Sequence, residues 1–241
     1  PGGTRRQAPD NVVADEHTGR PLRTISPEGA HSMAAYVYVP CFTPDERYVF
    51  FQAEVGGRAQ LHRFEIETGT LTQFSEAESF GLLRFCVHPA GREVFYFADG
   101  KYWAADIETR ETRLVFDADG EGLRDVKQLI MFSPSGAWFS FSYVNARDRI
   151  CVARARSDGA GFETVLERPQ GEGVQHVMFA GADENLMSFS PAPDHQQDWD
   201  LPDSVRGRTH LVYADSGEVE PLLALPKPYT ATHDYWCPRG Q

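Results

Sequence analysis

Along most of the chain, apolar and polar residues alternate with a period of two. The candidate strand segments include "YVFFQAE" at 48–54, "EVFYFAD" at 93–99 and "ETRLVFD" at 111–117. Short stretches rich in Gly, Asp and Asn separate these segments, and no segment has a convincing helical stripe of apolar residues. A period of two with such turns is typical of antiparallel β-strands that bury one face. The pattern therefore predicts an all-β chain.

A short motif recurs along the chain: an apolar residue, a turn with proline, and then an aromatic and β-branched run. It reads "CFTPDERYVFF", "CVHPAGREVFYF" and "MFSPSGAWFSF", and its prolines Pro44, Pro89 and Pro134 recur every 45 residues. A degenerate copy places Gly181 at the next equivalent position, and Pro238 marks a further one. A repeat of about 45 residues that holds four short strands is typical of a β-propeller blade.

The repeat predicts that residues 1–241 form one β-propeller domain of four-stranded antiparallel blades, incomplete in this chain. Residues 11–26 resemble the second half of a blade and are expected to close the ring against the C-terminal blade. Because the fifth repeat has only its first strand, we expect a larger ring in the complete protein; a genuine five-bladed ring is the alternative. The expected blades are 31–76, 80–117, 125–167, 174–225 and the start of a fifth at 230–241.

Composition limits the classes of partner. The chain is 41% hydrophobic, enough for a full-sized core, and has no apolar run long enough to span a bilayer. Its formal net charge of -12 argues against nucleic acid, which is bound through clustered Lys and Arg, but leaves an anionic small substrate possible. The four cysteines lie in or beside apolar runs without a C-x-x-C pair, so we expect reduced, structural thiols and a cytoplasmic location.

Two histidines occupy equivalent positions in the repeat. Five residues before the turn position are Val39, Arg84, Leu129, His176 and His233. The first strand of a propeller blade is the innermost, so His176 and His233 are expected to be neighbours at one mouth of the central channel. The alternative is a pair of half-buried histidines bonded to backbone carbonyls.

Other candidate residues lie outside this register. His31 precedes the innermost strand of the first blade and is expected to approach the channel, whereas His62 and His210 are expected at the surface. The polar insertion "PAPDHQQDWDLPDSVRGR" ends with Arg206 and Arg208, a local source of positive charge. The sequence lacks a serine-hydrolase elbow, a phosphate-binding loop and the usual metal-ligand spacings.

The ordered set "GVQHVMF", "WDLPDSVRGR" and "THDYW", together with the first repeat, resembles the oligogalacturonate lyases. These are seven-bladed propeller enzymes of pectin breakdown, which cleave short galacturonides by β-elimination with a divalent metal, usually manganese. The similarity runs from about residue 15 to the end of the chain. The T-P-D and T-G turns are common to many propellers, whereas the ordered set is much more specific.

The resemblance implies roles for particular residues. His233, in "THDYW", matches the proton-abstracting base, and Arg208 matches the arginine for the substrate carboxylate, with Arg206 as the alternative. His176 and His31 match histidines near the substrate cleft. The family's metal ligands fall beyond residue 241, so no manganese ligand is assigned here and this chain alone is expected to be inactive.

The chain departs from the family at Ser190-Pro191-Ala192-Pro193, where a Cys-His-Glu-Gly-Pro run is usual. This removes a His-Glu pair from the cleft and bears on the substrate. Two further interpretations remain: a non-catalytic, TolB-like propeller that binds proteins, and the propeller of a serine peptidase. The peptidase is the least favoured, because such propellers need no histidine pair at the channel.

Overall fold

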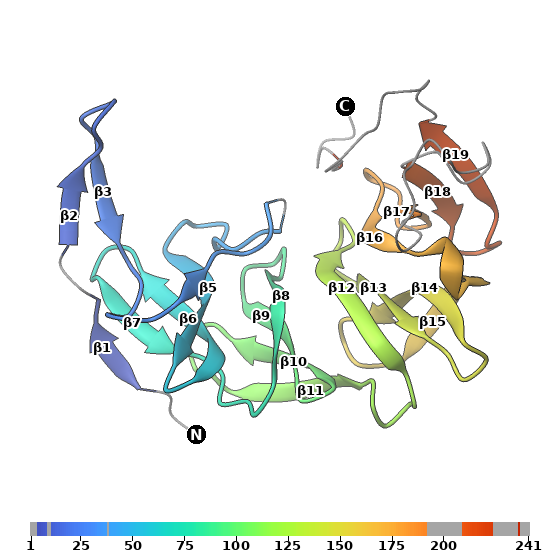
Figure 1. The fold of residues 1–241 in the computed structure, drawn as a ribbon, viewed down its shortest axis with the longest axis horizontal. Helices are drawn as coiled ribbons and strands as arrows, with labels where there is room; N and C mark the ends of the chain where they lie inside the picture. The colour runs from blue at the N-terminus through green and yellow to red at the C-terminus, as the bar shows by residue number, and fades with distance from the viewer. Residues whose placement is uncertain (1–3, 9–10, 38, 192–208, 224–235, 237–241) are drawn as a thin grey trace. The chain divides into compact units, whose positions relative to one another are not determined.

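The computed structural model describes residues 4–8, 11–37, 39–191, 209–223 and 236. These residues form antiparallel sheets and one short 3-10 helix at Gln170–Glu172, with no α-helix among them (Figure 1). The predicted all-β fold class is confirmed. No helix in the described ranges is long and apolar enough to cross a membrane. The chain divides into two compact units, residues 1–99 with 103–113 and residues 100–102 with 114–241.

The first sheet has five strands in the order β1-β7-β6-β5-β4. They are β1 (Arg5–Gln7), β4 (Ser32–Met33), β5 (Tyr48–Val55), β6 (Arg58–Glu65) and β7 (Thr70–Gln73). The three-residue β1 pairs antiparallel with β7 and so covers the outer edge of this sheet. Between β1 and β4 in sequence, β2 (Asn11–Ala14) and β3 (Pro21–Thr24) form a separate two-stranded hairpin.

Three further sheets have four strands each, and their strands are paired in chain order. The second contains β8 (Phe80–Val87), β9 (Glu93–Ala98), β10 (Lys101–Asp106) and β11 (Thr112–Asp117). The third contains β12 (Arg124–Phe132), β13 (Trp138–Val144), β14 (Arg149–Arg156) and β15 (Phe162–Pro169). The fourth contains β16 (Gln175–Phe179), β17 (Leu186–Ser190), β18 (Thr209–Tyr213) and β19 (Val219–Leu223).

The recurrent prolines lie in equivalent turns, as predicted. In each turn, the carbonyl oxygen of the residue before the proline accepts a hydrogen bond from the backbone amide two positions after the proline. The amide of the residue before the proline donates to the carbonyl oxygen of the first residue of the second strand. Proline suits the second position of such a turn because its φ is already fixed near the required value. The turn donors are Glu46, Gly91 and Gly136, all with positive φ.

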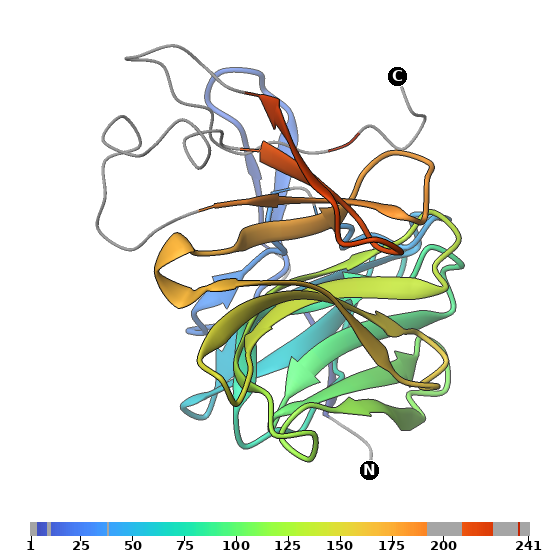
Figure 2. The same ribbon diagram turned by 90° about the vertical axis from the view of Figure 1, so that its right-hand side faces the viewer.

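Large side chains fill the space between successive sheets within each unit. A cluster between the first and second sheets includes Phe50, Leu61, Phe85 and Tyr96. A second cluster, which we call the β14–β18 core, joins the third and fourth sheets, whose strands lie side by side in Figure 2. It consists of Ile150, Val152, Val165, Val174, Val177, Phe179, Met187, Phe189 and Val212. Each of these sheets therefore completes its core against its neighbour in the chain.

Two histidines that we expected at the surface are buried. His62 on β6 is 1% exposed and His210 on β18 is 2% exposed. Their rings stack on Phe51 and Phe189, with ring centroids 5.8 and 5.5 Å apart. The prediction was wrong because both faces of these strands are covered, so period-two alternation does not separate inside from outside there. The cysteines of the described ranges, Cys41, Cys86 and Cys151, are free thiols, as expected.

Candidate functional site

The first strand of each four-stranded repeat lies at one edge of its sheet, and its backbone is irregular. The pairing register shifts within β8, β12 and β16, where the first strand meets the second. In each of these strands one non-glycine residue has a positive φ: Leu83, Asp125 and His176, at 56°, 47° and 51°. Such bulges re-aim side chains and are frequent at functional sites, although a non-glycine residue with positive φ is energetically unfavourable. Each of these edges is therefore a candidate functional region within its own unit.

His176, predicted to lie near the substrate, occupies the bulge of β16. It is half-buried and follows Gln175, which pairs with Ser190 on β17. The next residue, Val177, is fixed from the preceding sheet, because the buried Ser140 hydroxyl donates a 2.8 Å hydrogen bond to its carbonyl oxygen. The imidazole of His176 is thus attached to a strained stretch of backbone. The carbonyl oxygen of the following residue is held by a side chain of the preceding sheet.

His31, the second predicted substrate contact, immediately precedes β4 and is exposed. Its carbonyl oxygen accepts a 2.8 Å hydrogen bond from the Glu54 amide, so the pairing of β4 with β5 extends to this residue. The backbone of His31 is therefore ordered by the sheet while its side chain is open to solvent. His31 and His176 belong to different compact units.

The proposed base and its partners fall outside the described ranges. These are His233, Arg206 and Arg208, and their predicted roles stay predictions. Trp236, which closes the "THDYW" motif, is described. Its indole N–H donates a 2.8 Å hydrogen bond to the hydroxyl of Ser188 on β17, a fully buried residue. The end of this motif is thus attached to the fourth sheet.

These hydrogen bonds follow a common pattern. Side chains on the second strand of one sheet bond to the segment that follows in the next repeat. Gln52 on β5 accepts a 2.9 Å hydrogen bond from the amide of Leu83, the left-handed residue of β8. The Ser140 hydroxyl donates to the carbonyl oxygen of Val177, and the Ser188 hydroxyl accepts from the indole N–H of Trp236. The sequence holds a signal that we did not use, since the two serines sit in matching S-F-S segments, "WFSFSY" and "LMSFSP".

The departure from the lyase pattern lies beside this region. Ser190 ends β17, is fully buried, and pairs with Gln175, the residue before His176. Pro191, which follows it, is also buried. Ser190, where this departure begins, therefore lies directly across the ladder from the residue before the candidate histidine.

A metal centre is not formed by the side chains that the structure describes. No group of three or more His, Cys, Asp or Glu residues among them is arranged to hold a metal ion. His176 and His31 contribute single imidazoles from separate units. The described residues therefore do not supply a manganese site.

Comparison with known proteins identifies the class of fold. No protein family profile matches the sequence, and no curated protein matches it. Among solved structures, TolB from Acinetobacter baumannii aligns with a TM-score of 0.58 and 14% identity, over 88% of this chain and 48% of its own. With the antiparallel four-stranded repeats, this likeness makes the chain a β-propeller protein of TolB-like blades, as predicted.

Two oligogalacturonate lyase structures are more similar. One, an oligogalacturonate lyase in complex with manganese, aligns with a TM-score of 0.85 and 18% identity over 99% of this chain. Another, from Vibrio parahaemolyticus, aligns with a TM-score of 0.84 and 17% identity over 98% of it. The chain spans 66% and 65% of the length of those two proteins. The resemblance expected from the sequence thus holds at the level of the fold.

Proposed function

We propose that the protein containing this chain is a lyase of oligogalacturonate type, which cleaves short galacturonides by β-elimination. The observation that carries the proposal is the fold shared with two oligogalacturonate lyases over 99% and 98% of the chain. The motifs that contain His176, Arg208 and His233 support it, since their order along the sequence resembles that of the oligogalacturonate lyases.

The reaction requires a base and a neutralised carboxylate. His233 removes the proton at C5, the electrons of that C–H bond form the C4–C5 double bond, and the O4 glycoside leaves and is protonated. A neutral imidazole suits this step because its pKa lies near the working pH. The C5 carbanion is accessible only if the adjacent carboxylate is neutralised, and a guanidinium such as that of Arg208 can pair with it in bidentate fashion.

The remaining residues orient the substrate in this proposal. His176 and His31 contact the oligosaccharide, with Arg206 as a further cation at the cleft. Manganese is part of the proposal only for the whole protein, because the described residues do not form a site for it. The half-buried position of His176 on a left-handed bulge supports a contact role, since its side chain is turned out of the regular ladder.

The alternative is a non-catalytic propeller that binds proteins. The TolB likeness favours it, but with a TM-score of 0.58 against 0.85 it accounts for the fold less closely. The two proposals differ in a direct way. A binding platform needs no ionisable group in the "THDYW" motif, whereas the lyase requires one there.

The test is a continuous assay of digalacturonate cleavage by the complete protein with manganese, followed through the near-ultraviolet absorbance of the unsaturated product. We expect His233→Ala to lower kcat by a factor of about 10²–10⁴, the usual cost of removing a general base. His17→Ala, which changes an exposed histidine of the β2–β3 turn, is the matched control and should keep full activity. Absence of unsaturated product from the unaltered protein would favour the binding platform. Activity of His233→Ala within a factor of a few would place the base elsewhere.

A further inference from the structure

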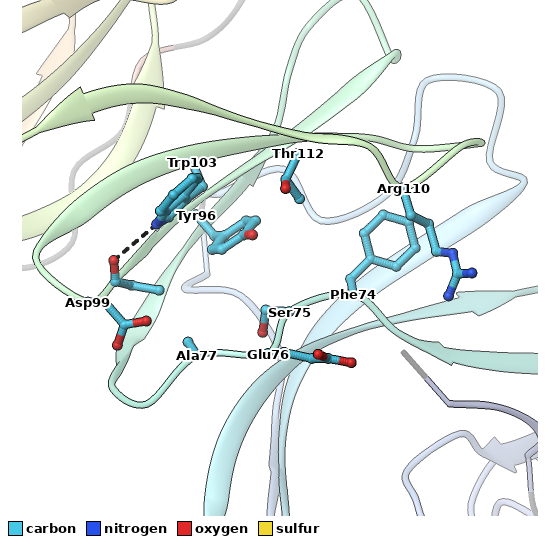
Figure 3. A pocket seen from close by; sticks show the side chains of 10 residues that line it. Phe74, Ser75, Glu76, Ala77, Tyr96, Asp99, Trp103, Arg110 and Thr112 are labelled. Carbon is cyan, nitrogen blue, oxygen red and sulfur yellow. Dashed lines mark hydrogen bonds between the residues drawn. The ribbon is translucent and has the colours of Figure 1, made fainter. Parts of the chain in front are cut away.

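A cavity of about 180 Å³ lies within the first compact unit, between the segment after β7 and the face of the second sheet. Figure 3 shows its lining side chains, which come from the segment that follows β7, from β9, β10 and β11, and from the turns that join these strands. The lining includes no residue of β8, the first strand of that sheet. The cavity is therefore separate from the strand edge that carries the candidate catalytic region.

Aromatic rings form the apolar part of the lining. Tyr96, Trp103 and Phe74 all border the cavity, and Trp103 is only half-buried (Figure 3). The indole N–H of Trp103 is already used, because it donates a 3.2 Å hydrogen bond to the carbonyl of Ala98. This bond fixes the ring, so that the indole offers carbon surface rather than a donor to any occupant. A fixed aromatic surface suits a ligand with a flat apolar face.

Polar groups gather around these rings. Glu76, Asp99 and Thr112 are exposed and Arg110 is half-buried. One oxygen of the Asp99 carboxylate accepts a 2.7 Å hydrogen bond from the Ser79 amide, which orients the carboxylate. The rim thus combines acceptors, a hydroxyl and a guanidinium donor around an aromatic wall.

The charges select a neutral occupant. An anion would meet the carboxylates of Glu76 and Asp99, and a cation would meet the guanidinium of Arg110. Like charges that face each other in an interface are unfavourable. A neutral molecule with several hydroxyl groups can instead accept from the guanidinium and donate to the carboxylates, without introducing a charge.

The size of the cavity limits the occupant further. Sites for drug-sized ligands are commonly about 300–1,000 Å³, so a cavity of about 180 Å³ fits a single ring. A pyranose has an apolar face of C–H groups and a rim of hydroxyls, which matches an aromatic wall bordered by polar groups. We propose that this cavity is a binding site for one uncharged pyranose ring, distinct from the candidate lyase site.

The test uses the complete protein and ligand-observed saturation-transfer NMR with three probes. These are methyl β-D-galactopyranoside, sodium D-galacturonate and choline, which carry no charge, a negative charge and a positive charge. We expect saturable binding of the neutral sugar that depends on Trp103, and no Trp103-dependent binding of either ion, since D-galacturonate can also bind at the proposed lyase site. Binding of either ion that depends equally on Trp103, or no saturable binding of the neutral sugar, would overturn the proposal.

Variants of Trp103 test whether the neutral sugar binds in this cavity. Trp103→Ala should weaken binding of the neutral sugar about tenfold, and Trp103→Phe should restore most of it, because a flat aromatic face is retained. Trp138→Ala is the matched control, since Trp138 is another half-buried tryptophan, in the third sheet. Circular dichroism at each variant's working temperature confirms folding.

The same variants separate this proposal from the lyase proposal. Trp103→Ala should leave the rate of digalacturonate cleavage unchanged, because its site is not the reacting one. If Trp138→Ala weakens sugar binding as much as Trp103→Ala does, or if Trp103→Ala also abolishes cleavage, a separate site is excluded. A protein without lyase activity that still binds the neutral sugar through Trp103 would refute the first proposal and support this one.

Discussion

The imidazole of His62 shows how strongly burial acts on a single residue of this fold. Burial lowers the pKa of His62 to about 4, and the nearby positive charge of Arg6 acts in the same direction. The ring nitrogen Nδ1 lies 3.1 Å from the carbonyl oxygen of Gln60, a contact that opposes the shift only in part. The folded protein therefore holds His62 neutral across the range in which a free histidine becomes charged.

This pKa shift predicts a pH dependence of stability. An unfolded histidine takes up a proton near pH 6.5, whereas native His62 does so only near pH 4. The unfolded state thus binds more protons between these values, and stability falls as the pH drops from about 6.5 towards 4, with no effect above that range. At pH 5 the loss from this group should be about 2 kcal/mol relative to pH 7.

Urea unfolding of the unaltered protein and of His62→Phe at pH 7 and pH 5 measures the contribution of His62 to the pH dependence of the unfolding free energy. The other titrating groups are common to both proteins, so they cancel in the difference between the two pH dependences. His62→Phe should lose about 2 kcal/mol less than the unaltered protein on going to pH 5. His17→Gln, at an exposed position, should behave like the unaltered protein. An unchanged pH dependence in His62→Phe would contradict the assignment.

At this scale the sequence could predict only part of the site. Equivalent repeat positions pointed to His176, which the structure places on an irregular, half-buried stretch of β16. The same reasoning failed for His62 and His210. A periodic pattern reports which face of a strand a residue lies on, and these strands are buried on both faces.

At the scale of elements, a cation links the first sheet to the turn after β10. Arg63 on β6 is 7% exposed, and its guanidinium lies over the rings of Tyr48 and Phe74, 4.3 and 5.0 Å from their centroids. Its Nη1 donates a hydrogen bond to the carbonyl of Ile107. Arg47 lies over the same Tyr48 ring at 4.6 Å, but its own side chain is 47% exposed, and it pairs with the exposed Glu108 and the buried Glu65.

These two arginines form a matched pair for mutation. Arg63→Ala removes a buried cation, two ring contacts and a bond to the neighbouring sheet, so it should cost about 3 kcal/mol of unfolding free energy. Arg47→Ala removes a half-exposed cation and its pairs with Glu108 and Glu65, and it should cost less, about 1 kcal/mol. Denaturant unfolding of both variants tests this contrast. Similar losses in the two would show that the buried contacts of Arg63 do not stabilise the link.

Elements that contain proline turns and alternating runs could be predicted from the sequence, and others could not. Pro44, Pro89 and Pro134 marked turns that the structure shows to be equivalent. The strand β1 has no such signal, because its three residues, Arg5–Gln7, are all polar and exposed. The bulges of β8, β12 and β16 were also missed, since a bulge interrupts the alternation by which strands are recognised.

At the scale of the whole molecule, neighbouring sheets share their cores. The β14–β18 core takes residues such as Val152 from the third sheet and Phe189 from the fourth, both fully buried. Neither sheet can bury this surface alone. The two sheets should therefore open together rather than one at a time, as expected for repeats whose stability depends on their interfaces.

Hydrogen exchange can test this coupling. Phe189→Ala should cost about 3–5 kcal/mol and lower amide protection in both β12–β15 and β16–β19. Leu222→Ala, at a 48% exposed position of the fourth sheet, is the control and should change stability by about 0.5 kcal/mol or less. Loss of protection confined to the fourth sheet in Phe189→Ala would indicate that the two sheets unfold independently.

Side chains on the second strand of one repeat bond to the first segment of the next repeat. These contacts restrict the exchange of one repeat for another. The peptide at Leu83 depends on Gln52, the one at Val177 on Ser140, and Trp236 on Ser188. A chimaera that transplants one blade at its own boundaries would separate each acceptor from its donor. The unit that recombination can exchange without loss is therefore offset from the structural blade. It runs from the second strand of one sheet through the first strand of the next.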